Sequence, residues 1–155
     1  MRYKQRGTSL FRQSRPTLPA PSWFAAALDH KPEHSDIDVD GCRIHLRTWG
    51  DPEKPALVLV HGGGAHSGWW DHIAPFFCPT HRVIAPDLSG HGDSESRPSY
   101  HLHTWAREVL AAVTIAGPRG QPTVVGHSLG GWVAARVGHH ARWQIDSIEI
   151  GRAHV

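Results

Sequence analysis

Thiols and long apolar runs are both scarce in this sequence, and each scarcity excludes a class of protein. Only two cysteines, Cys42 and Cys78, occur among 155 residues, which is too few for a disulfide framework and gives no metal-ligand spacing. We expect both thiols to be reduced. No stretch approaches the roughly 18 apolar residues of a membrane span, and the N-terminus lacks the apolar run of a secretion signal. The expectation is one soluble, cytoplasmic domain with no membrane partner.

A basic folded surface is also missing, although the formal net charge is +2. Five positive residues precede the first acid, namely Arg2, Lys4, Arg6, Arg12 and Arg15. The positive excess therefore lies at the N-terminus, and the rest of the chain gives no reason to expect a nucleic acid partner. Because residues 1–21 also contain several prolines and show no apolar period, we expect them to form a disordered basic extension.

The 14 histidines raise the question of a metal site, particularly at the pairs His101/His103 and His139/His140. Neither pair lies beside a cluster of carboxylates or thiols with ligand spacing. Histidine is more commonly exposed or hydrogen-bonded than metal-bound, so we expect no metal and no cofactor.

An antiparallel pair of strands is predicted after residue 36. Ile37 and Val39 alternate with acids, and the same alternation continues over residues 44–48. Asp40-Gly41 between the two runs is a strong signal for a tight hairpin turn.

A continuous apolar run follows at residues 56–60, and similar buried runs are predicted at residues 82–85 and 122–125. Runs of this kind are typical of strands that are buried on both faces. Helical spacing separates them: one helix is predicted from Trp105, Val109 and Val113, and another from Trp69, Ile73 and Phe76, with these aromatic stripes interpreted as core packing. Alternating strands and helices predict an α/β fold, with a mostly parallel sheet covered by helices on both faces.

A glycine-rich motif follows each of the three apolar runs. The first is His61-Gly62-Gly63-Gly64, the second runs from Asp87 through Gly90 and Gly92 to Ser94, and the third is Gly126-His127-Ser128-Leu129-Gly130. Open α/β sheets bind ligands at the carboxyl ends of their strands, so we expect the three motifs to meet there.

The third motif has the form of a nucleophile elbow. Such an elbow requires a strand, a turn so sharp that the serine is strained, and a helix that starts at once. Residues 124–125 supply the strand, residues 131–137 the helix, and Gly126 and Gly130 the clearance for their close approach. Ser128 is therefore predicted to be a nucleophile.

Two backbone amides are candidates for an oxyanion hole beside Ser128. The N–H of Leu129 lies at the start of the predicted helix, where the helix dipole favours negative charge. The first motif supplies the second candidate, the N–H of Gly63, with Gly64 as the next choice, since glycine lets the backbone approach a substrate oxygen.

Residues 36–148 resemble the α/β-hydrolase family, in the branch with an HG-x-G loop, a D-x-x-G-x-G-x-S segment and a GHSxGG elbow. The resemblance implies that Asp87, Gly90, Gly92 and Ser94 shape a loop. It likewise implies that His61 and His127 brace loops beside the site, where Gly62, Gly64, Gly126 and Gly130 also lie.

The serine at the elbow favours acyl chemistry, since haloalkane dehalogenases and epoxide hydrolases of this fold carry aspartate there. The resemblance implies a small-molecule ester or related acyl substrate, an acyl-enzyme on Ser128 and no cofactor. Three alternatives stay open: a cofactor-free perhydrolase or haloperoxidase, a C–C bond hydrolase, and a non-catalytic ligand-binding homologue. Trp69 and Trp70 are candidates for the acyl pocket, although core packing is the more common role.

The family order is nucleophile, then acid, then histidine, so both partners of Ser128 are expected after the elbow. Few residues remain there, with a sixth strand predicted at 144–150. We interpret residues 22–148 as the N-terminal part of a hydrolase domain that lacks its acid and histidine. Residues 149–155 read like the translation of a common sequencing-library adapter and are interpreted as a non-native tail, with a genuine short variant as the alternative. The expected consequences are an inactive chain of low solubility.

Overall fold

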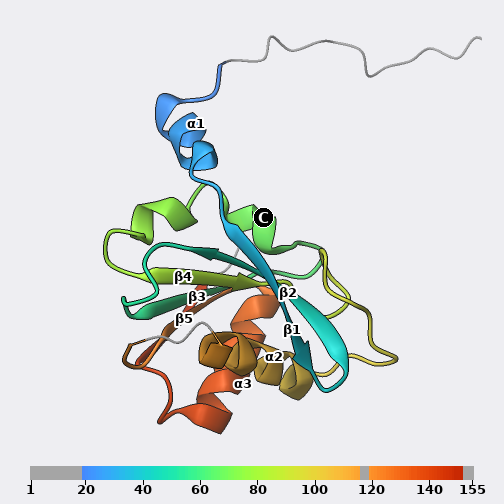
Figure 1. Ribbon diagram of the computed structural model, residues 1–155. Helices are drawn as coiled ribbons and strands as arrows, with labels where there is room; N and C mark the ends of the chain where they lie inside the picture. The colour runs from blue at the N-terminus through green and yellow to red at the C-terminus, as the bar shows by residue number, and fades with distance from the viewer. Residues whose placement is uncertain (1–18, 116–118, 152–155) are drawn as a thin grey trace, which may run out of the picture.

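A computed structural model describes residues 19–115 and 119–151 (Figure 1). Its centre is one sheet of six strands in the order β1-β2-β4-β3-β5-β6. The strands are β1 (Glu33–Val39), β2 (Cys42–Trp49), β3 (Ala56–Val60), β4 (Arg82–Pro86), β5 (Thr123–His127) and β6 (Ser147–Gly151). The last four in this order are parallel, and β2 pairs antiparallel with both β1 and β4. The predicted α/β fold with a mostly parallel sheet is confirmed.

The hairpin between β1 and β2 turns at Asp40 and Gly41, as predicted. Both residues have positive φ, 54° and 72° respectively, which is the backbone of a type I′ turn. Val39 lies opposite Cys42, so the tight turn fixes a register in which the apolar side chains of both strands share one face.

The sheet is buried on both faces by two separate apolar clusters. In β3, Val58 and Val60 belong to a large cluster, whereas Leu57 and Leu59 belong to a smaller one. Because side chains alternate along a strand, these clusters lie on opposite faces. This double burial is the physical reason that β3 reads as a continuous apolar run.

Two helices, α2 (Leu102–Ile115) and α3 (Leu129–Ala141), cover the face of the larger cluster and lie side by side (Figure 1). Val109 and Val113 in α2 are buried, and Trp105 packs against the same cluster. The helix predicted from these three residues is therefore confirmed. Among the described residues, no helix combines the length and the apolarity needed to cross a membrane.

The helix predicted from Trp69, Ile73 and Phe76 is wrong. The structure has two short 3₁₀ helices there, η1 (Ser67–Trp70) and η2 (Ala74–Phe77), and Trp69 and Phe76 are 55% and 58% exposed. Pro75 explains the break, because its ring and missing N–H prevent one continuous helix through this segment. Only Trp70 follows the core interpretation, by packing against the smaller cluster.

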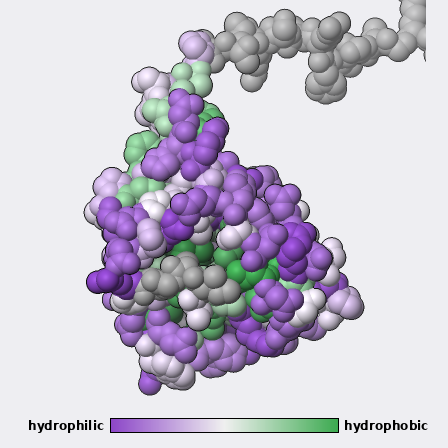
Figure 2. Space-filling view, in the orientation of Figure 1, coloured by the Kyte–Doolittle hydropathy of each residue, from purple (hydrophilic) through white to green (hydrophobic). Residues whose placement is uncertain are grey.

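A helix, α1 (Ser22–Asp29), stands outside the sheet at one end of the molecule (Figure 1), and it projects from the rest of the described surface in the space-filling view (Figure 2). Its Trp23 ring lies 6.1 Å from that of Phe76 in η2. Most of the predicted extension, residues 1–18, lies outside the described residues. At the other end, β6 includes residues 149–151 of the predicted tail, and residues 152–155 lie outside the described part.

Candidate active site

The carboxyl ends of β3, β4 and β5 meet at one edge of the sheet, and the three glycine-rich motifs meet with them. An added Cβ at Gly62 would lie 3.4 Å from the Cβ of Ser128, and one at Gly63 would lie 3.6 Å from Leu129 Cδ2. The loop after β3 is thus in contact with the turn after β5. Sequence reasoning predicted this meeting from the parallel sheet alone.

Ser128 has the strained backbone expected of a nucleophile elbow. Its φ is 53° and its ψ is −112°, a conformation that is costly for a residue with a side chain. It lies between the end of β5 and Leu129, the first residue of α3. The Ser128 N–H donates to the carbonyl of Gly151 in β6 at 2.9 Å, and the Ser128 carbonyl accepts from Gly131 N–H at 2.9 Å. Both bonds hold the turn in place.

The flanking glycines allow the strand and the helix to approach each other. An added Cβ at Gly126 would lie 2.6 Å from the backbone nitrogen of Gly131, and one at Gly130 would lie 2.6 Å from the carbonyl oxygen of His61. Contacts of this kind with backbone atoms cannot be relieved by side-chain rotation. The elbow therefore requires glycine at both positions.

Two amides beside Ser128 are free. Among the described residues, neither the N–H of Gly63 nor that of Leu129 has a hydrogen-bond acceptor. The Leu129 amide lies at the first turn of α3, where the dipole of a helix favours negative charge. These are the two donors that sequence reasoning assigned to an oxyanion, and the structure leaves both available.

His61 connects the two loops that follow β3 and β4. Its Nδ1–H donates to the carbonyl of Gly62 at 2.8 Å, and its Nε2 accepts from Leu88 N–H at 3.0 Å. Burial lowers the pKa of this imidazole and so favours the neutral ring. The two hydrogen bonds place its proton on Nδ1. The ring is thus a brace between the loops that follow β3 and β4.

The side chains of His127 and Trp69 pack against each other next to the elbow. The two rings lie 5.8 Å apart between centroids, and an added Cβ at Gly62 would lie 3.0 Å from His127 Nδ1. Trp69 is exposed beside the elbow, and its role in an acyl pocket stays a prediction, whereas Trp70 packs against the smaller apolar cluster.

Asp87 organises the loop after β4. Burial opposes its ionisation, but hydrogen bonds from the backbone N–H groups of Asp93 and Ser67 hold the pKa of this carboxyl below its ordinary value. Its carbonyl accepts from Ser94 Oγ at 2.6 Å, and Ser94 Oγ in turn accepts from His45 N–H at 2.8 Å. The ionised Asp87 thus ties η1, this loop and β2 together.

Among the described residues, one group of possible metal ligands comes together: His45, Asp87 and Asp93, whose ligand atoms lie within 4.8 Å of one another. Both ring nitrogens of His45 are engaged, Nδ1 with Asp36 and Nε2 with His34. The Asp87 carboxylate already accepts two backbone hydrogen bonds. Because these donors are committed to the protein, we assign no ion to them.

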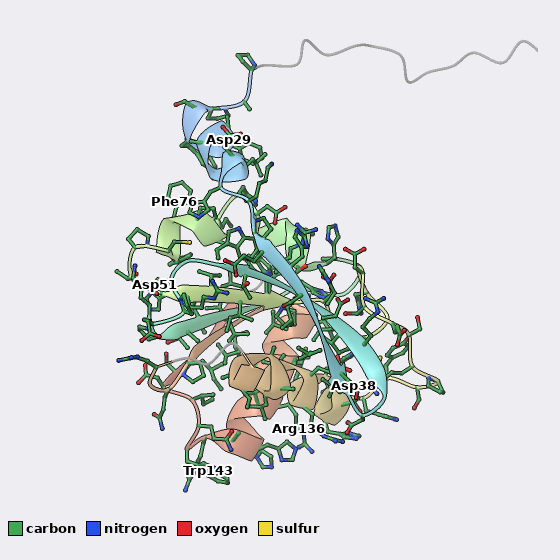
Figure 3. The ribbon with its side chains drawn as sticks, in the orientation of Figure 1. Asp29, Asp38, Asp51, Phe76, Arg136 and Trp143 are labelled. Carbon is green, nitrogen blue, oxygen red and sulfur yellow. The ribbon has the colours of Figure 1, made fainter. Side chains whose placement is uncertain are left out.

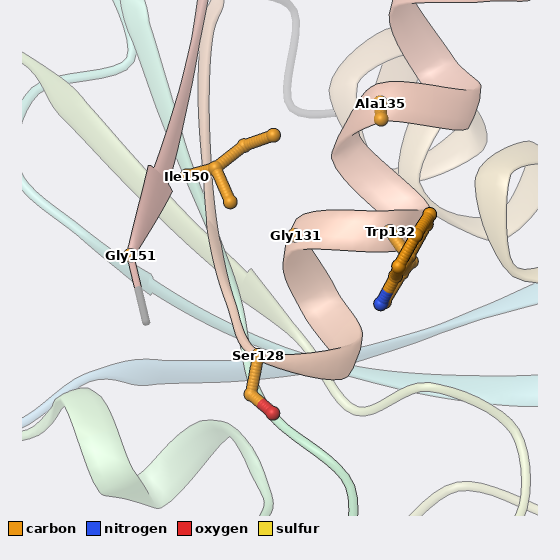
Figure 4. Close-up of a pocket in the computed structure, with 6 residues that line it drawn as sticks. All are labelled: Ser128, Gly131, Trp132, Ala135, Ile150 and Gly151. Carbon is orange, nitrogen blue, oxygen red and sulfur yellow. The ribbon is translucent and has the colours of Figure 1, made fainter. Parts of the chain in front are cut away.

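A cavity of about 460 Å³ lies next to the nucleophile. It is lined by Ser128, by Gly131, Trp132 and Ala135 on the first turns of α3, and by Ile150 and Gly151 at the end of β6 (Figure 4). Sequence reasoning missed the contribution of Trp132 and Ile150, because it depends on β6 lying beside β5. No local pattern carries that information.

Ser128 has no catalytic partner in the described part of the chain. Neither a histidine nitrogen nor a carboxylate oxygen is hydrogen-bonded to its Oγ there. Among the histidines of the motifs, His61 is committed to Gly62 and Leu88. The described residues therefore supply the candidate nucleophile and two amides without acceptors, and they supply no base at Ser128.

A family model described as "Alpha/beta hydrolase family" matches residues 57–153. Among curated proteins, the pimeloyl-[acyl-carrier protein] methyl ester esterase of Methylococcus capsulatus is 38% identical over 96 residues, covering 62% of this chain and 36% of that protein. A non-heme chloroperoxidase of Streptomyces lividans is 35% identical over 99 residues, covering 63% and 36%. The chain spans about a third of the length of the curated relatives it matches.

A solved structure, the epoxide hydrolase CorEH without ligand, is similar in backbone. It superposes with a TM-score of 0.71 at 32% sequence identity, covering 76% of this chain and 41% of that one. These three relatives are named as an esterase, a chloroperoxidase and an epoxide hydrolase. The comparisons therefore agree on the family, and the reactions that the relatives are named for differ.

Proposed function

The chain belongs to the alpha/beta hydrolase family, and on this premise we propose that it supplies the nucleophile and oxyanion hole of a serine hydrolase. The substrate class is a carboxylic ester or a related acyl compound. The observation that carries the proposal is the strained Ser128 beside two amides without acceptors. The similarity to a methyl ester esterase supports the choice of substrate class.

In the proposed reaction, Ser128 Oγ attacks the acyl carbonyl and loses its proton to a histidine base. The carbonyl oxygen becomes an oxyanion, which accepts hydrogen bonds from the N–H groups of Gly63 and Leu129. Each donor of this kind lowers the barrier by roughly 3 kcal/mol. Departure of the alcohol leaves an acyl-enzyme, which water hydrolyses to the carboxylic acid and free Ser128.

The base and its orienting acid are proposed to come from a longer protein that contains this chain. In the family order both follow the nucleophile, and no described residue fills either role at Ser128. Without a base the hydroxyl stays un-ionised near neutral pH, so the 155-residue chain alone is proposed to be inactive.

Serine also separates this proposal from the reaction of the similar epoxide hydrolase. Opening of an epoxide by enzymes of this fold uses an aspartate at the elbow, whereas Ser128 occupies that position here. An acyl substrate suits a serine because the acyl-enzyme ester is hydrolysed by attack at its carbonyl.

Hydrolysis of p-nitrophenyl butyrate by the longer protein tests the proposal. Ser128→Ala is expected to lower kcat at least about a thousandfold, whereas Ser35→Ala, an exposed serine in β1, is expected to leave it unchanged. Circular dichroism checks that both variants fold. If wild type and Ser128→Ala were equally active, another residue would be the nucleophile. If neither hydrolysed the ester, the chain would belong to a non-catalytic protein or to an enzyme with another substrate. Turnover by the 155-residue chain that disappears in Ser128→Ala would contradict its proposed inactivity.

A second candidate is perhydrolysis, which the similarity to a chloroperoxidase favours. Here hydrogen peroxide replaces water in the second step, so that the acyl-enzyme and hydrogen peroxide give a peroxy acid and free Ser128. The two candidates share the first step. Measuring peroxy acid against carboxylic acid formed from an ester in the presence of hydrogen peroxide distinguishes them.

A further inference from the structure

A second concave site lies on the helical layer, where α2 and α3 pass each other. It has a volume of about 400 Å³ and is lined by His103, Ala106, Arg107, Leu110, Arg136 and His140. None of these residues lines the cavity at Ser128. Arg136 is about 10 Å along α3 from Leu129, so this groove is separate from the elbow.

Helical spacing gives the groove an apolar floor with basic walls. His103 and Arg107 are one turn apart on α2, and Arg136 and His140 are one turn apart on α3, so each helix presents one basic ridge. Ala106 is buried at the bottom of the groove, and Leu110 packs against the large apolar cluster. A basic rim above an apolar floor is complementary to an amphiphilic anion.

No carboxylate lines this groove. Arg107 is paired outside it with Asp40 of the hairpin turn, but Arg136 forms no ion pair with any described residue. Arg136 is half-buried where the two helices meet (Figure 3). One guanidinium without an acid can bind one carboxylate through two parallel hydrogen bonds.

The electrostatic environment of His140 agrees with this. Residual desolvation and repulsion by Arg136, His139 and His103 hold the pKa of this imidazole below its ordinary value. No carboxylate is among the groups that act on this imidazole. Arg136 therefore carries the positive charge of the groove that no described acid compensates, whereas Arg107 is paired with Asp40.

We propose that this groove binds a single-chain carboxylate with an apolar tail, such as a medium-chain fatty-acid anion. The carboxylate pairs with Arg136, and the tail lies on Ala106 and Leu110. The volume suits one chain rather than a two-chain lipid. This site is independent of the function proposed for Ser128, because it uses none of the same residues.

Calorimetric titration of the 155-residue chain with dispersed decanoate tests the proposal, with acetate and octyl glucoside as probes that lack the tail or the charge. Decanoate is expected to bind, and both other probes to bind at least about tenfold more weakly. Arg136→Glu is expected to weaken decanoate binding at least about tenfold. Arg142→Glu makes the same change of charge just beyond α3, outside the groove, and is the matched control.

Three results would overturn the proposal. Equal binding of octyl glucoside would show that the groove is merely apolar. Equal weakening by Arg136→Glu and Arg142→Glu would show that only the net charge matters. Binding to vesicles of anionic phospholipid without binding of dispersed decanoate would assign the basic ridges to a membrane surface. Esterase activity is not the readout, so failure here leaves the proposal for Ser128 untouched.

Discussion

Asp87 is nearly inaccessible to solvent and yet ionised, because its carboxylate accepts two backbone N–H groups. The sequence motif predicted that this residue shapes a loop. It could not predict that one of the two donors is the N–H of Ser67, since that contact joins segments that are separate in the chain.

Asp87→Asn is expected to destabilise the chain by about 1–3 kcal/mol at pH 7, because an amide cannot accept both hydrogen bonds as well as a carboxylate. The folded pKa of Asp87 is lowered. Its contribution is therefore fully present above the unfolded pKa of about 3.9 and is lost as the pH falls through the lower folded pKa. Urea unfolding at pH 7 and pH 3 should show the difference between wild type and variant shrinking. A constant difference, or an equal effect of Asp93→Asn at an exposed acid, would contradict this account.

Gly130→Ala tests the close approach at the elbow. The new methyl group would meet the carbonyl oxygen of His61, and such overpacking against backbone costs about 1–3 kcal/mol. Gly138→Ala in the same helix would meet only side-chain atoms, chiefly Cδ1 of Ile148, which can rotate away. Denaturant unfolding should therefore show a larger loss for Gly130→Ala, and the reverse order would contradict the tight elbow.

Element by element, the sequence predicted what local periodicity controls. The face of α2 followed from the spacing of Trp105, Val109 and Val113, and the buried strands followed from their apolar runs. The prediction of one helix over the segment of η1 and η2 was wrong, because Pro75 prevents the continuous helix that the apolar spacing favours. Glu108 was not foreseen, since a carboxylate within a buried helix face has no periodic signature.

Glu108 attaches α2 to the loop after β4. Its fully buried carboxylate accepts from Ser89 N–H and pairs with Arg97, both at 2.9 Å. Glu108→Gln is expected to destabilise the chain by about 3 kcal/mol, because it leaves the Arg97 guanidinium buried without an acid. Arg107→Ala, which breaks an exposed ion pair on the same helix, is expected to cost less than about 1 kcal/mol. If Glu108→Gln and Arg107→Ala lowered the free energy of unfolding equally in urea, the buried pair would contribute no more than the exposed one.

At the scale of the whole molecule, the sequence predicted a mostly parallel sheet but not its strand order. That order places β6 at the end of the sheet beside β5, so its outer edge pairs with no described strand. Ile150 in β6 and Trp132 in α3 are 60% and 69% exposed there. An open edge beside exposed apolar side chains favours association with other chains.

The 155-residue chain is therefore expected to self-associate as its concentration rises. Ile150→Lys and Trp132→Lys should each shift sedimentation toward the monomer, because they place charge beside the open edge. Trp23→Lys, on exposed α1 at the other end of the molecule, is the control and should have little effect. A chain that remains monomeric at high concentration would contradict this expectation.

The assignment of Ser128 as the nucleophile joins all three scales: a strained residue, a strand-turn-helix element and the meeting of three loops at one edge of the sheet. Labelling of the longer protein with a fluorophosphonate, followed by peptide mass spectrometry, tests it most directly. The account predicts one phosphonate adduct, on Ser128, together with loss of ester hydrolysis, and no adduct in Ser128→Ala. An active protein that carries its adduct on another residue, or that hydrolyses esters without any adduct at Ser128, would contradict it.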